Sequence, residues 1–293
     1  MTLAQYLAEQ QSRVEAALER WVPPESTLPE SIHKAMRYSL FAGGKRIRPI
    51  LCLAAAEAVS DSPSGIESCA STLELIHTYS LIHDDLPALD NDDLRRGVPT
   101  CHKVFGDAVA ILAGDALLTL AFQVLAQMDC APDRKVALVA ELSTAAGTVG
   151  GMIGGQVSDL EGEGRPPDAA LLESIHRAKT GALLRASLRM GAIYAGADSD
   201  QLSALSCFGE HVGLAFQIVD DVLDVEQSSE ALGKTAGKDA EQQKITFPAV
   251  YGLERSRRMA EQERLAAHLA LRPFDERAGR LRELADFIVY RRA

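Results

Sequence analysis

Two clusters of aspartate residues carry the strongest chemical signal in this sequence of 293 residues. The first cluster comprises Asp84, Asp85 and Asp90, and the second comprises Asp220, Asp221 and Asp224. Oxygen donors of this kind, with no His or Cys among them, select a hard cation such as Mg²⁺. The sequence therefore predicts that both clusters bind magnesium.

The spacing of the second cluster predicts one face of a helix. The polar stripe runs at positions i, i+3, i+4 and i+7 and comprises Gln217, Asp220, Asp221 and Asp224. The opposing stripe is apolar, is expected to face the core, and comprises Ala215, Ile218, Val222 and Val225. Carboxylates crowded on one stripe repel one another by a few tenths of a kcal/mol per exposed pair. We therefore expect a cation beside them.

The first cluster requires a break in its helix. His77, Ser80 and Asp84 share a face at i, i+3 and i+7, whereas Asp90 would lie about 120° away in an undisturbed helix. Because Pro87 cannot continue a helix, the chain is expected to break there and bring Asp90 back. One acidic cluster alone is equally compatible with a solvated helix end, but two such clusters favour metal binding.

Basic residues that could bind phosphate accompany the acidic clusters. Lys45, Arg46 and Arg48 follow the two glycines of GGKRIRP, and Arg95 and Arg96 follow the first aspartate cluster. Guanidinium groups match phosphate oxygens bidentately, and lysine acts as a point charge. Further lysines, each also compatible with a solvated surface charge, are Lys179, Lys234, Lys238 and Lys244. With a net charge of −11 the chain is not expected to bind nucleic acid, and polyphosphate held through metal bridges fits better.

The elements that must position these residues are helices. Ala and Leu are abundant, aromatic residues make up 5% of the chain, and no alternating strand pattern or fixed repeat occurs. An opening helix from Leu3 to Trp21 is expected, followed by helices near residues 31–42, 48–60, 68–83, 106–128, 134–159, 169–195, 200–225, 247–269 and 277–291. The polar interval 226–243 is expected to be a loop. We predict one all-α domain over residues 1–293.

Compartment and membrane signals are weak. The longest Leu-rich uncharged run, residues 116–128, has 13 residues, short of the ~20 that a bilayer requires. The N-terminus lacks the basic segment of a secretory signal. The five cysteines are scattered without a CxxC pair, so neither disulfides nor a zinc site are expected, and a cytoplasmic location fits.

Taken together, the motifs resemble the trans-isoprenyl diphosphate synthase family, most closely bacterial farnesyl diphosphate synthases (geranyltranstransferases). The likeness runs over nearly the whole chain, in GGKRIRP, ELIHTYSLIHDDLPALDNDDLRRGVPTCH, GGQVSDL, AKTGALL, FQIVDDVLD and GKTAGKD. It implies a helical bundle around a central cavity, a homodimer, and a transferase of isoprene biosynthesis. This prenyltransferase would condense isopentenyl diphosphate with dimethylallyl and then geranyl diphosphate to give farnesyl diphosphate.

The resemblance also implies roles for individual residues. Roughly three Mg²⁺ ions would be bound by the six aspartates of the two clusters. Isopentenyl diphosphate would be bound by Lys45, Arg48, His77 and Arg96. The allylic diphosphate would be bound by Arg95, Lys179, Lys234 and Lys244. The residues closest to the ionisation step would be Asp84, Asp85, Asp220, Lys179, Thr180 and Gln217, of which Thr180 and Gln217 place dipoles beside the developing carbocation.

Chain length is expected to depend on Tyr79 and Ser80. Tyr79 precedes Asp84 by five residues, which is about 7.5 Å along a helix axis, and Ser80 is small. A prenyl chain anchored at Asp84 would extend past Ser80 until it met the Tyr79 ring. In the resembling family an aromatic residue at this position accompanies a fifteen-carbon product. The alternative is a packed tyrosine with a satisfied hydroxyl.

Three other functions compete with a farnesyl diphosphate synthase. The nearest is a synthase of longer chains, such as geranylgeranyl diphosphate. A class I terpene cyclase also uses a DDxxD motif, but GGKRIRP and the second acidic motif argue against it. A non-catalytic partner subunit is disfavoured because all six aspartates are intact. Two departures from the family pattern are Phe247 in place of a frequent Tyr, and a tail that ends in Tyr290-Arg291-Arg292-Ala293.

Overall fold

The protein is all-α, as the sequence predicts. The computed structural model describes residues 1–61, 63–166, 168–226 and 245–291. Contacts divide the chain into two compact units, Met1–Ile50 with Ser64–Lys135, and Leu51–Pro63 with Val136–Ala293. Whether residues 1–293 act as one domain stays a prediction.

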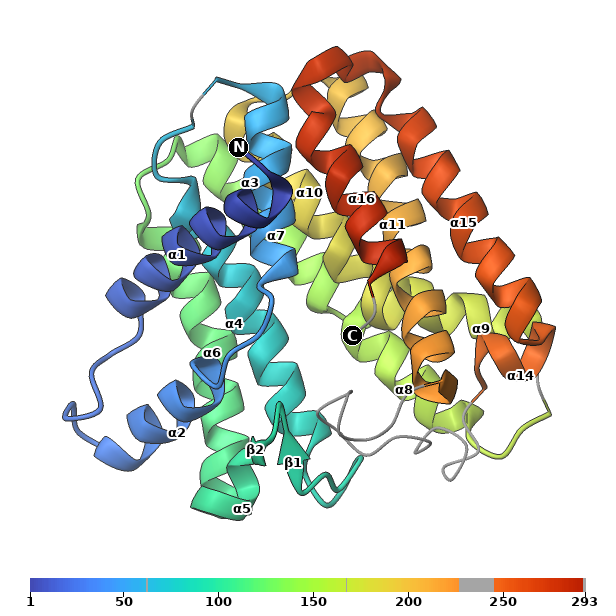
Figure 1. Cartoon of the computed structure of the whole chain (residues 1–293). Coiled ribbons are helices and arrows are strands. Elements are labelled where there is room, and N and C mark those ends of the chain that lie inside the picture. The colour runs from blue at the N-terminus through green and yellow to red at the C-terminus, as the bar shows by residue number, and fades with distance from the viewer. Residues whose placement is uncertain (62, 167, 227–244, 292–293) are drawn as a thin grey trace. The chain divides into compact units, whose positions relative to one another are not determined.

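The first unit is built around helix α4. Its helices are α1 (Leu3–Trp21), α2 (Glu30–Leu40), the first turn of α3 (Ile47–Val59), α4 (Ile66–Asp84), α5 (Cys101–Phe105) and α6 (Asp107–Gln127). Helix α4 packs against α6, α1 and α2, and Figure 1 shows α4 and α6 side by side. Most of α4 is buried, and its buried residues include small polar side chains and Glu74 as well as apolar ones.

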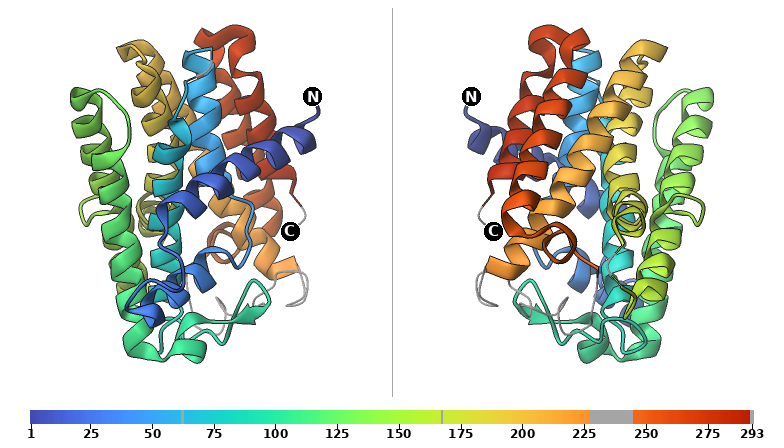
Figure 2. Two further views of the ribbon diagram at one scale, coloured as in Figure 1. Left: turned by 90° about the vertical axis from the view of Figure 1, so that its left-hand side faces the viewer. Right: turned by 90° about the vertical axis from the view of Figure 1, so that its right-hand side faces the viewer.

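The second unit holds the remaining helices. They are the rest of α3, α7 (Pro132–Ala146), α8 (Met152–Gly162), α9 (Ala169–His176), the π-helix η1 (Arg177–Gly181), α10 (Ala182–Ala195), α11 (Ser199–Glu226), α14 (Phe247–Tyr251), α15 (Leu253–Ala270), the 3₁₀-helix η2 (Arg272–Ala278) and α16 (Gly279–Tyr290). Helix α11 packs against α15 and α10, and the two views of Figure 2 show α11 beside α15. The long helix α11 thus carries the second aspartate cluster on a well-packed support.

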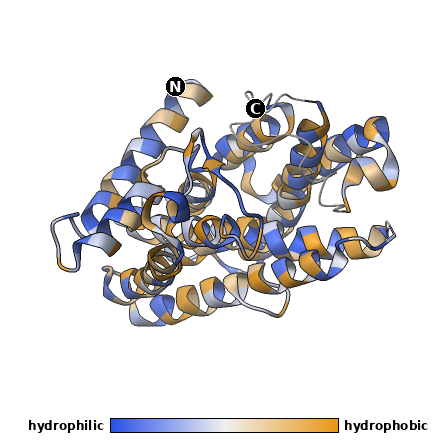
Figure 3. Cartoon of the chain, turned by 90° about the horizontal axis from the view of Figure 1, so that it is seen from below, coloured by the Kyte–Doolittle hydropathy of each residue, from blue (hydrophilic) through white to orange (hydrophobic). Residues whose placement is uncertain are grey.

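Local sequence explains where the helices begin and how they pack. Helix α1 begins with a capping box in which the Gln5 backbone N–H donates to Thr2 Oγ1 at 3.3 Å and the Thr2 N–H donates to Gln5 Oε1 at 2.9 Å. Its buried side includes Val14 and Leu18. Figure 3 shows hydrophobic and hydrophilic residues interspersed along many helices, as expected of helices that bury one face.

Four sequence predictions need correction. The stretch 247–269 is two helices, α14 and α15, because the chain breaks at Gly252, which has a φ of 79°. The stretch 134–159 is two helices, because the chain turns at residues 147–151, where Gly150 adopts a left-handed φ of 66°. A two-stranded hairpin, β1 (Leu94–Arg95) with β2 (Val98–Pro99), was not predicted because two-residue strands have no detectable periodicity. The predicted apolar stripe of α11 is only partly buried: Ala215, Ile218 and Val222 are buried, but Val225 is 61% exposed. Val225 is exposed because α11 ends one residue beyond it. The predicted loop 226–243 lies outside the described residues except for Glu226.

Two helices, α6 and α11, are long and apolar enough by length and composition to cross a membrane. Buried core helices often have the same length and composition, so these two helices are weak evidence for a membrane span. Both helices pack closely against neighbours, and α11 carries three aspartates in its last two turns. That the chain has no membrane span therefore stays a prediction.

Candidate active site

The first aspartate motif lies where α4 ends and the chain turns back. Helix α4 ends at Asp84, and the Asp90 backbone N–H donates to the Asp84 carbonyl oxygen at 2.8 Å. The predicted break before Pro87 and the return of Asp90 are confirmed. Asp84 and Asp90 are both half-buried.

Asp85 is held by an arginine. Its side chain is nearly buried, and Arg95 donates to Asp85 Oδ1 through Nε at 3.0 Å and through Nη2. Burial raises the pKa of the Asp85 carboxyl, and the hydrogen bonds and charge of Arg95 oppose this rise. Arg95 also lies 3.3 Å from Asp92 Oδ2. In this arrangement Asp85 holds Arg95, and Asp84 and Asp90 are more exposed than Asp85.

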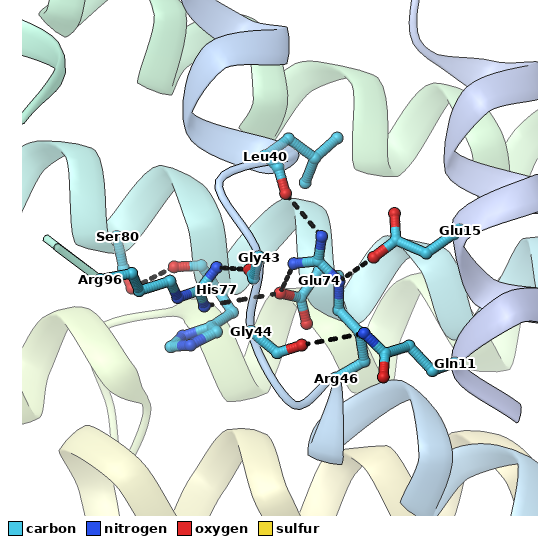
Figure 4. Close-up of polar contacts among 10 residues, drawn as sticks. All are labelled: Gln11, Glu15, Leu40, Gly43, Gly44, Arg46, Glu74, His77, Ser80 and Arg96. Carbon is cyan, nitrogen blue, oxygen red and sulfur yellow. Dashed lines mark hydrogen bonds and ion pairs between the residues drawn. The ribbon is translucent and has the colours of Figure 1, made fainter. Parts of the chain in front are cut away.

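Two of the residues expected to bind isopentenyl diphosphate, Arg48 and Arg96, lie close enough to His77 to act on its charge. Burial lowers the pKa of His77 well below its usual range, and the charges of Arg48, Arg96, Arg95 and Arg46 lower it further. These guanidinium groups therefore share one region of the first unit with His77. Figure 4 shows Arg96 beside His77 and the loop at Gly43. This concentration of positive charge suits a diphosphate ligand.

The second aspartate motif has a cation beside it, as its crowded carboxylates require. Arg291 Nη2 donates to Asp220 Oδ1 at 2.6 Å and to the Phe216 carbonyl oxygen at 3.0 Å. The Arg291 guanidinium also lies 3.9 Å from the centroid of the Phe216 ring. Sequence reasoning considered the tail only as a departure from the family and missed this contact.

Asp221 differs from Asp220 because it is buried in a hydrogen-bonded chain. Gln217 Nε2 donates to Asp221 Oδ1 at 2.9 Å, and the Phe247 backbone N–H donates to Asp221 Oδ2 at 2.9 Å. Thr180 Oγ1 donates to Gln217 Oε1 at 2.9 Å. The side-chain dipoles of Thr180 and Gln217 are thereby fixed by a buried carboxylate, and the ring of Phe247 stacks on His176 at 5.4 Å.

Lys179 lies in the π-helix η1, a conformation often found at functional sites. Its Nζ donates to Asp159 Oδ2 on α8 at 2.7 Å. A Cβ at Gly155 would lie 2.2 Å from the Lys179 backbone nitrogen, so only glycine allows α8 to approach this closely. Asp159 belongs to the GGQVSDL motif, but sequence reasoning gave it no role. Lys234 and Lys244 lie outside the described residues.

The aspartates supply donors for a divalent cation without forming a complete cluster. Among the described residues, no three His, Cys, Asp or Glu side chains converge to form a ready-made metal site. The available donors are nevertheless oxygen atoms alone, and Asp84, Asp90 and Asp220 remain partly exposed. Such donors fit Mg²⁺, which keeps several waters and binds through one or two carboxylates together with phosphate oxygens.

Tyr79 is buried and Ser80 is half-buried on α4. The Tyr79 ring packs edge-on against His83 at 5.8 Å, and burial together with Asp84 raises the pKa of Tyr79 to about 12. Its hydroxyl oxygen is buried and has no hydrogen-bond partner among the described residues. The role of Tyr79 in chain length stays a prediction. Ser80 Oγ donates to the His77 carbonyl oxygen at 2.9 Å, which turns the small side chain back onto its own helix.

Known proteins resemble this chain over nearly its full length. The polyprenyl synthetase family matches residues 29–285. The large subunit 1 of a chloroplastic heterodimeric geranylgeranyl pyrophosphate synthase of Arabidopsis thaliana is 50% identical, over 98% of this chain and 78% of its own. A farnesyl diphosphate synthase of Geobacillus stearothermophilus is 48% identical, over 92% of this chain and 89% of its own. A crystal structure of a putative farnesyl-diphosphate synthase from Marinomonas sp. MED121 has a TM-score of 0.85 at 40% identity and covers 99% of both chains.

The all-α fold and the acidic and basic motifs define a prenyltransferase of isoprenoid biosynthesis. This chain belongs to the polyprenyl synthetase family, whose members are trans-isoprenyl diphosphate synthases.

Proposed function

We propose that this protein is a farnesyl diphosphate synthase that condenses isopentenyl diphosphate with dimethylallyl diphosphate and then with geranyl diphosphate. The observation that carries the fifteen-carbon product is Tyr79. Its buried ring lies on α4, five residues before Asp84, where a diphosphate would be anchored. Tyr79 and Asp84 are separated by about 7.5 Å along the helix axis.

The chemistry requires ionisation of an allylic C–O bond and protection of the resulting carbocation. Bound Mg²⁺ supplies electrostatic stabilisation of the diphosphate leaving group. We assign its binding to the two aspartate motifs, with Asp84, Asp90 and Asp220 as the accessible donors. Arg95 and Lys179, each held by a carboxylate, would bind the allylic diphosphate. The fixed dipoles of Thr180 and Gln217 would face the carbocation.

The homoallylic substrate needs a separate cationic site without metal. Lys45, Arg48, His77 and Arg96 would bind isopentenyl diphosphate, whose double bond attacks the allylic cation. Loss of a proton to the departing pyrophosphate completes each condensation, so no side-chain nucleophile or protein general base is required.

One incubation tests the proposal. Purified protein with dimethylallyl diphosphate, isopentenyl diphosphate and Mg²⁺ should yield farnesyl diphosphate as the main product, sized by chromatography after dephosphorylation. Mainly twenty-carbon product would establish the second candidate, a geranylgeranyl diphosphate synthase, which the name of the Arabidopsis relative supports. Cyclic hydrocarbon made from farnesyl diphosphate alone would indicate a terpene cyclase instead.

Two further assignments accompany this function. We propose a homodimer, supported by helix α8, which exposes Ile153, Val157 and Leu160 at i, i+4 and i+7. Sedimentation equilibrium should give twice the chain mass of 31.5 kDa.

We also propose a cytoplasmic location, in keeping with five free cysteines.

A further inference from the structure

The charge of Arg46, in the GGKRIRP motif, is paired within the protein. Its side chain is fully buried, and its guanidinium donates in three directions. Nε donates to Glu15 Oε1 at 2.7 Å, Nη1 to Glu74 Oε1 at 2.6 Å, and Nη2 to the Leu40 carbonyl oxygen at 2.6 Å. Figure 4 shows this guanidinium between α1, α4 and the end of α2. Arg46 is therefore not available to bind a substrate phosphate.

The backbone of the same loop is held in unusual conformations. Arg46 has a φ of 51°, in the left-handed region that a residue other than glycine rarely adopts, and Gly43 and Gly44 have φ values of 93° and 124°. Such conformations persist only where surrounding contacts determine them. At Arg46 those contacts are its three hydrogen bonds. Lys45 lies one residue before Arg46, and Arg48 lies two residues after it, in the first turn of α3. The anchoring of Arg46 therefore fixes the backbone positions from which both side chains extend.

The buried carboxylate of Glu74 connects this loop to a second cation. Arg96 Nη2 lies 3.9 Å from Glu74 Oε1, the atom that accepts from Arg46, and Arg96 Nη1 donates to the Gly43 carbonyl oxygen. A Cβ at Gly44 would lie 2.6 Å from Arg96 Cζ, so the guanidinium packs directly against this glycine. Glu74 precedes His77 by three residues and so shares a face of α4 with it. One carboxylate thus joins the loop, the hairpin residue Arg96 and the helix that carries His77.

We propose that Arg46 and Glu74 are positioning residues for the isopentenyl diphosphate site, and that neither touches the substrate. Their buried ion pair holds Lys45, Arg48 and Arg96 in the arrangement that binds the diphosphate. The inference depends on the proposed function of this site. It also assigns a function to Glu15 on α1, far from Arg46 in sequence, as the third anchor of the loop.

Conservative substitutions at the two residues distinguish a positioning role from a purely electrostatic one. If Arg46 acted only as a nearby positive charge, Arg46→Lys would be neutral in effect, and Glu74→Gln, which removes a negative charge beside the site, would strengthen binding of isopentenyl diphosphate. If the pair positions the loop, both substitutions weaken binding. A lysine has no planar fork to reach three acceptors, and a glutamine leaves Arg46 and Arg96 without their shared anion.

The experiment measures KM for isopentenyl diphosphate and for the allylic substrate in Arg46→Lys, Arg46→Met and Glu74→Gln, together with calorimetric titration of isopentenyl diphosphate. We expect KM and Kd for isopentenyl diphosphate to rise about 10–100-fold, with kcat and the allylic KM changed by about twofold or less. The matched control is Glu67→Gln, because the Arg13–Glu67 ion pair of 2.6 Å also joins α1 to α4. This control should leave both KM values unchanged.

Tighter or unchanged binding in Glu74→Gln would overturn the proposal. So would an equal rise of both KM values, or the same rise in Glu67→Gln, because either would indicate a general loss of helix docking. If Arg46→Met does not fold, Arg46→Lys and Glu74→Gln still test the positioning role. A wild-type protein that binds isopentenyl diphosphate but makes no prenyl product would refute the proposed function, and the calorimetric comparison would still test the positioning pair.

Discussion

The guanidinium of Arg291 lies 2.6 Å from the carboxylate of Asp220, the first aspartate of the second motif. The arginine is nearly buried, whereas Asp220 keeps 43% of its side chain exposed. A tail residue thus neutralises the carboxylate that the proposed function assigns to Mg²⁺. A cation that binds Asp220 Oδ1 would compete with Arg291.

Removal of this arginine should strengthen metal binding. Arg291→Gln is expected to lower the dissociation constant for Mn²⁺, measured by electron paramagnetic resonance of the free ion, by about two- to fivefold, the size of a partly exposed ion pair. The control is Arg257→Gln, which removes an arginine paired with Glu226 on the same helix. Unchanged or weaker Mn²⁺ binding in Arg291→Gln would contradict the inference that Arg291 competes with the metal for Asp220.

Activity should depend on a divalent cation and on both motifs. Asp84→Ala and Asp220→Ala are each expected to lower kcat by about 10²–10³-fold or more, while circular dichroism shows an intact helical fold. Asp200→Ala is the control, because it removes the same charge from α11 about 30 Å from Asp220. Near-normal turnover of Asp220→Ala with EDTA present would refute metal-assisted ionisation.

The two substrates should respond to different cations. Lys45→Ala or Arg48→Ala should raise KM for isopentenyl diphosphate about 10–150-fold, because a hydrogen bond to a charged group contributes about 1.5–3 kcal/mol. Lys179→Ala should instead raise KM for the allylic substrate. Steady-state kinetics with one substrate saturating measures each value. Equal effects on both substrates from every variant would mean that the two sites are assigned wrongly.

The product length should change in opposite directions at neighbouring residues of α4. Tyr79→Ala removes a buried ring and should yield twenty-carbon or longer products. Ser80→Phe adds a ring one residue closer to Asp84 and should shift the output towards ten carbons. Chromatography of dephosphorylated products measures both. Active variants with an unchanged product would place the limit on chain length elsewhere.

The stability of the fold should fall as pH falls through the range in which His77 would titrate. Because burial and neighbouring arginines lower the pKa of His77, the unfolded chain binds a proton below about pH 6.5 that the folded chain does not. This residue therefore contributes a slope of at most about 1.4 kcal/mol per pH unit, with stability rising as pH rises. Urea unfolding between pH 5 and 7 should show a shallower slope in His77→Gln. An identical slope would mean that His77 titrates normally.

Much of the site could be predicted from sequence because its features are local. The end of α4 before Pro87, the return of Asp90 and the polar stripe of α11 all depend on residues within one or two helical turns. Steric limits of proline and the period of the helix determine such features without tertiary contacts. Sequence likewise determined the all-α class, because amphipathic periodicity recurs along the chain.

Only the tertiary structure distinguished residues of the same type. Arg46 is fully buried against Glu74. Asp221 is buried and the adjacent Asp220 is only half-buried, although the two aspartates look equivalent in sequence. The contact that neutralises Asp220 comes from Arg291, 71 residues further along the chain. Burial and ion pairing depend on which helices meet, and residue spacing within one helix holds no information about a partner on another.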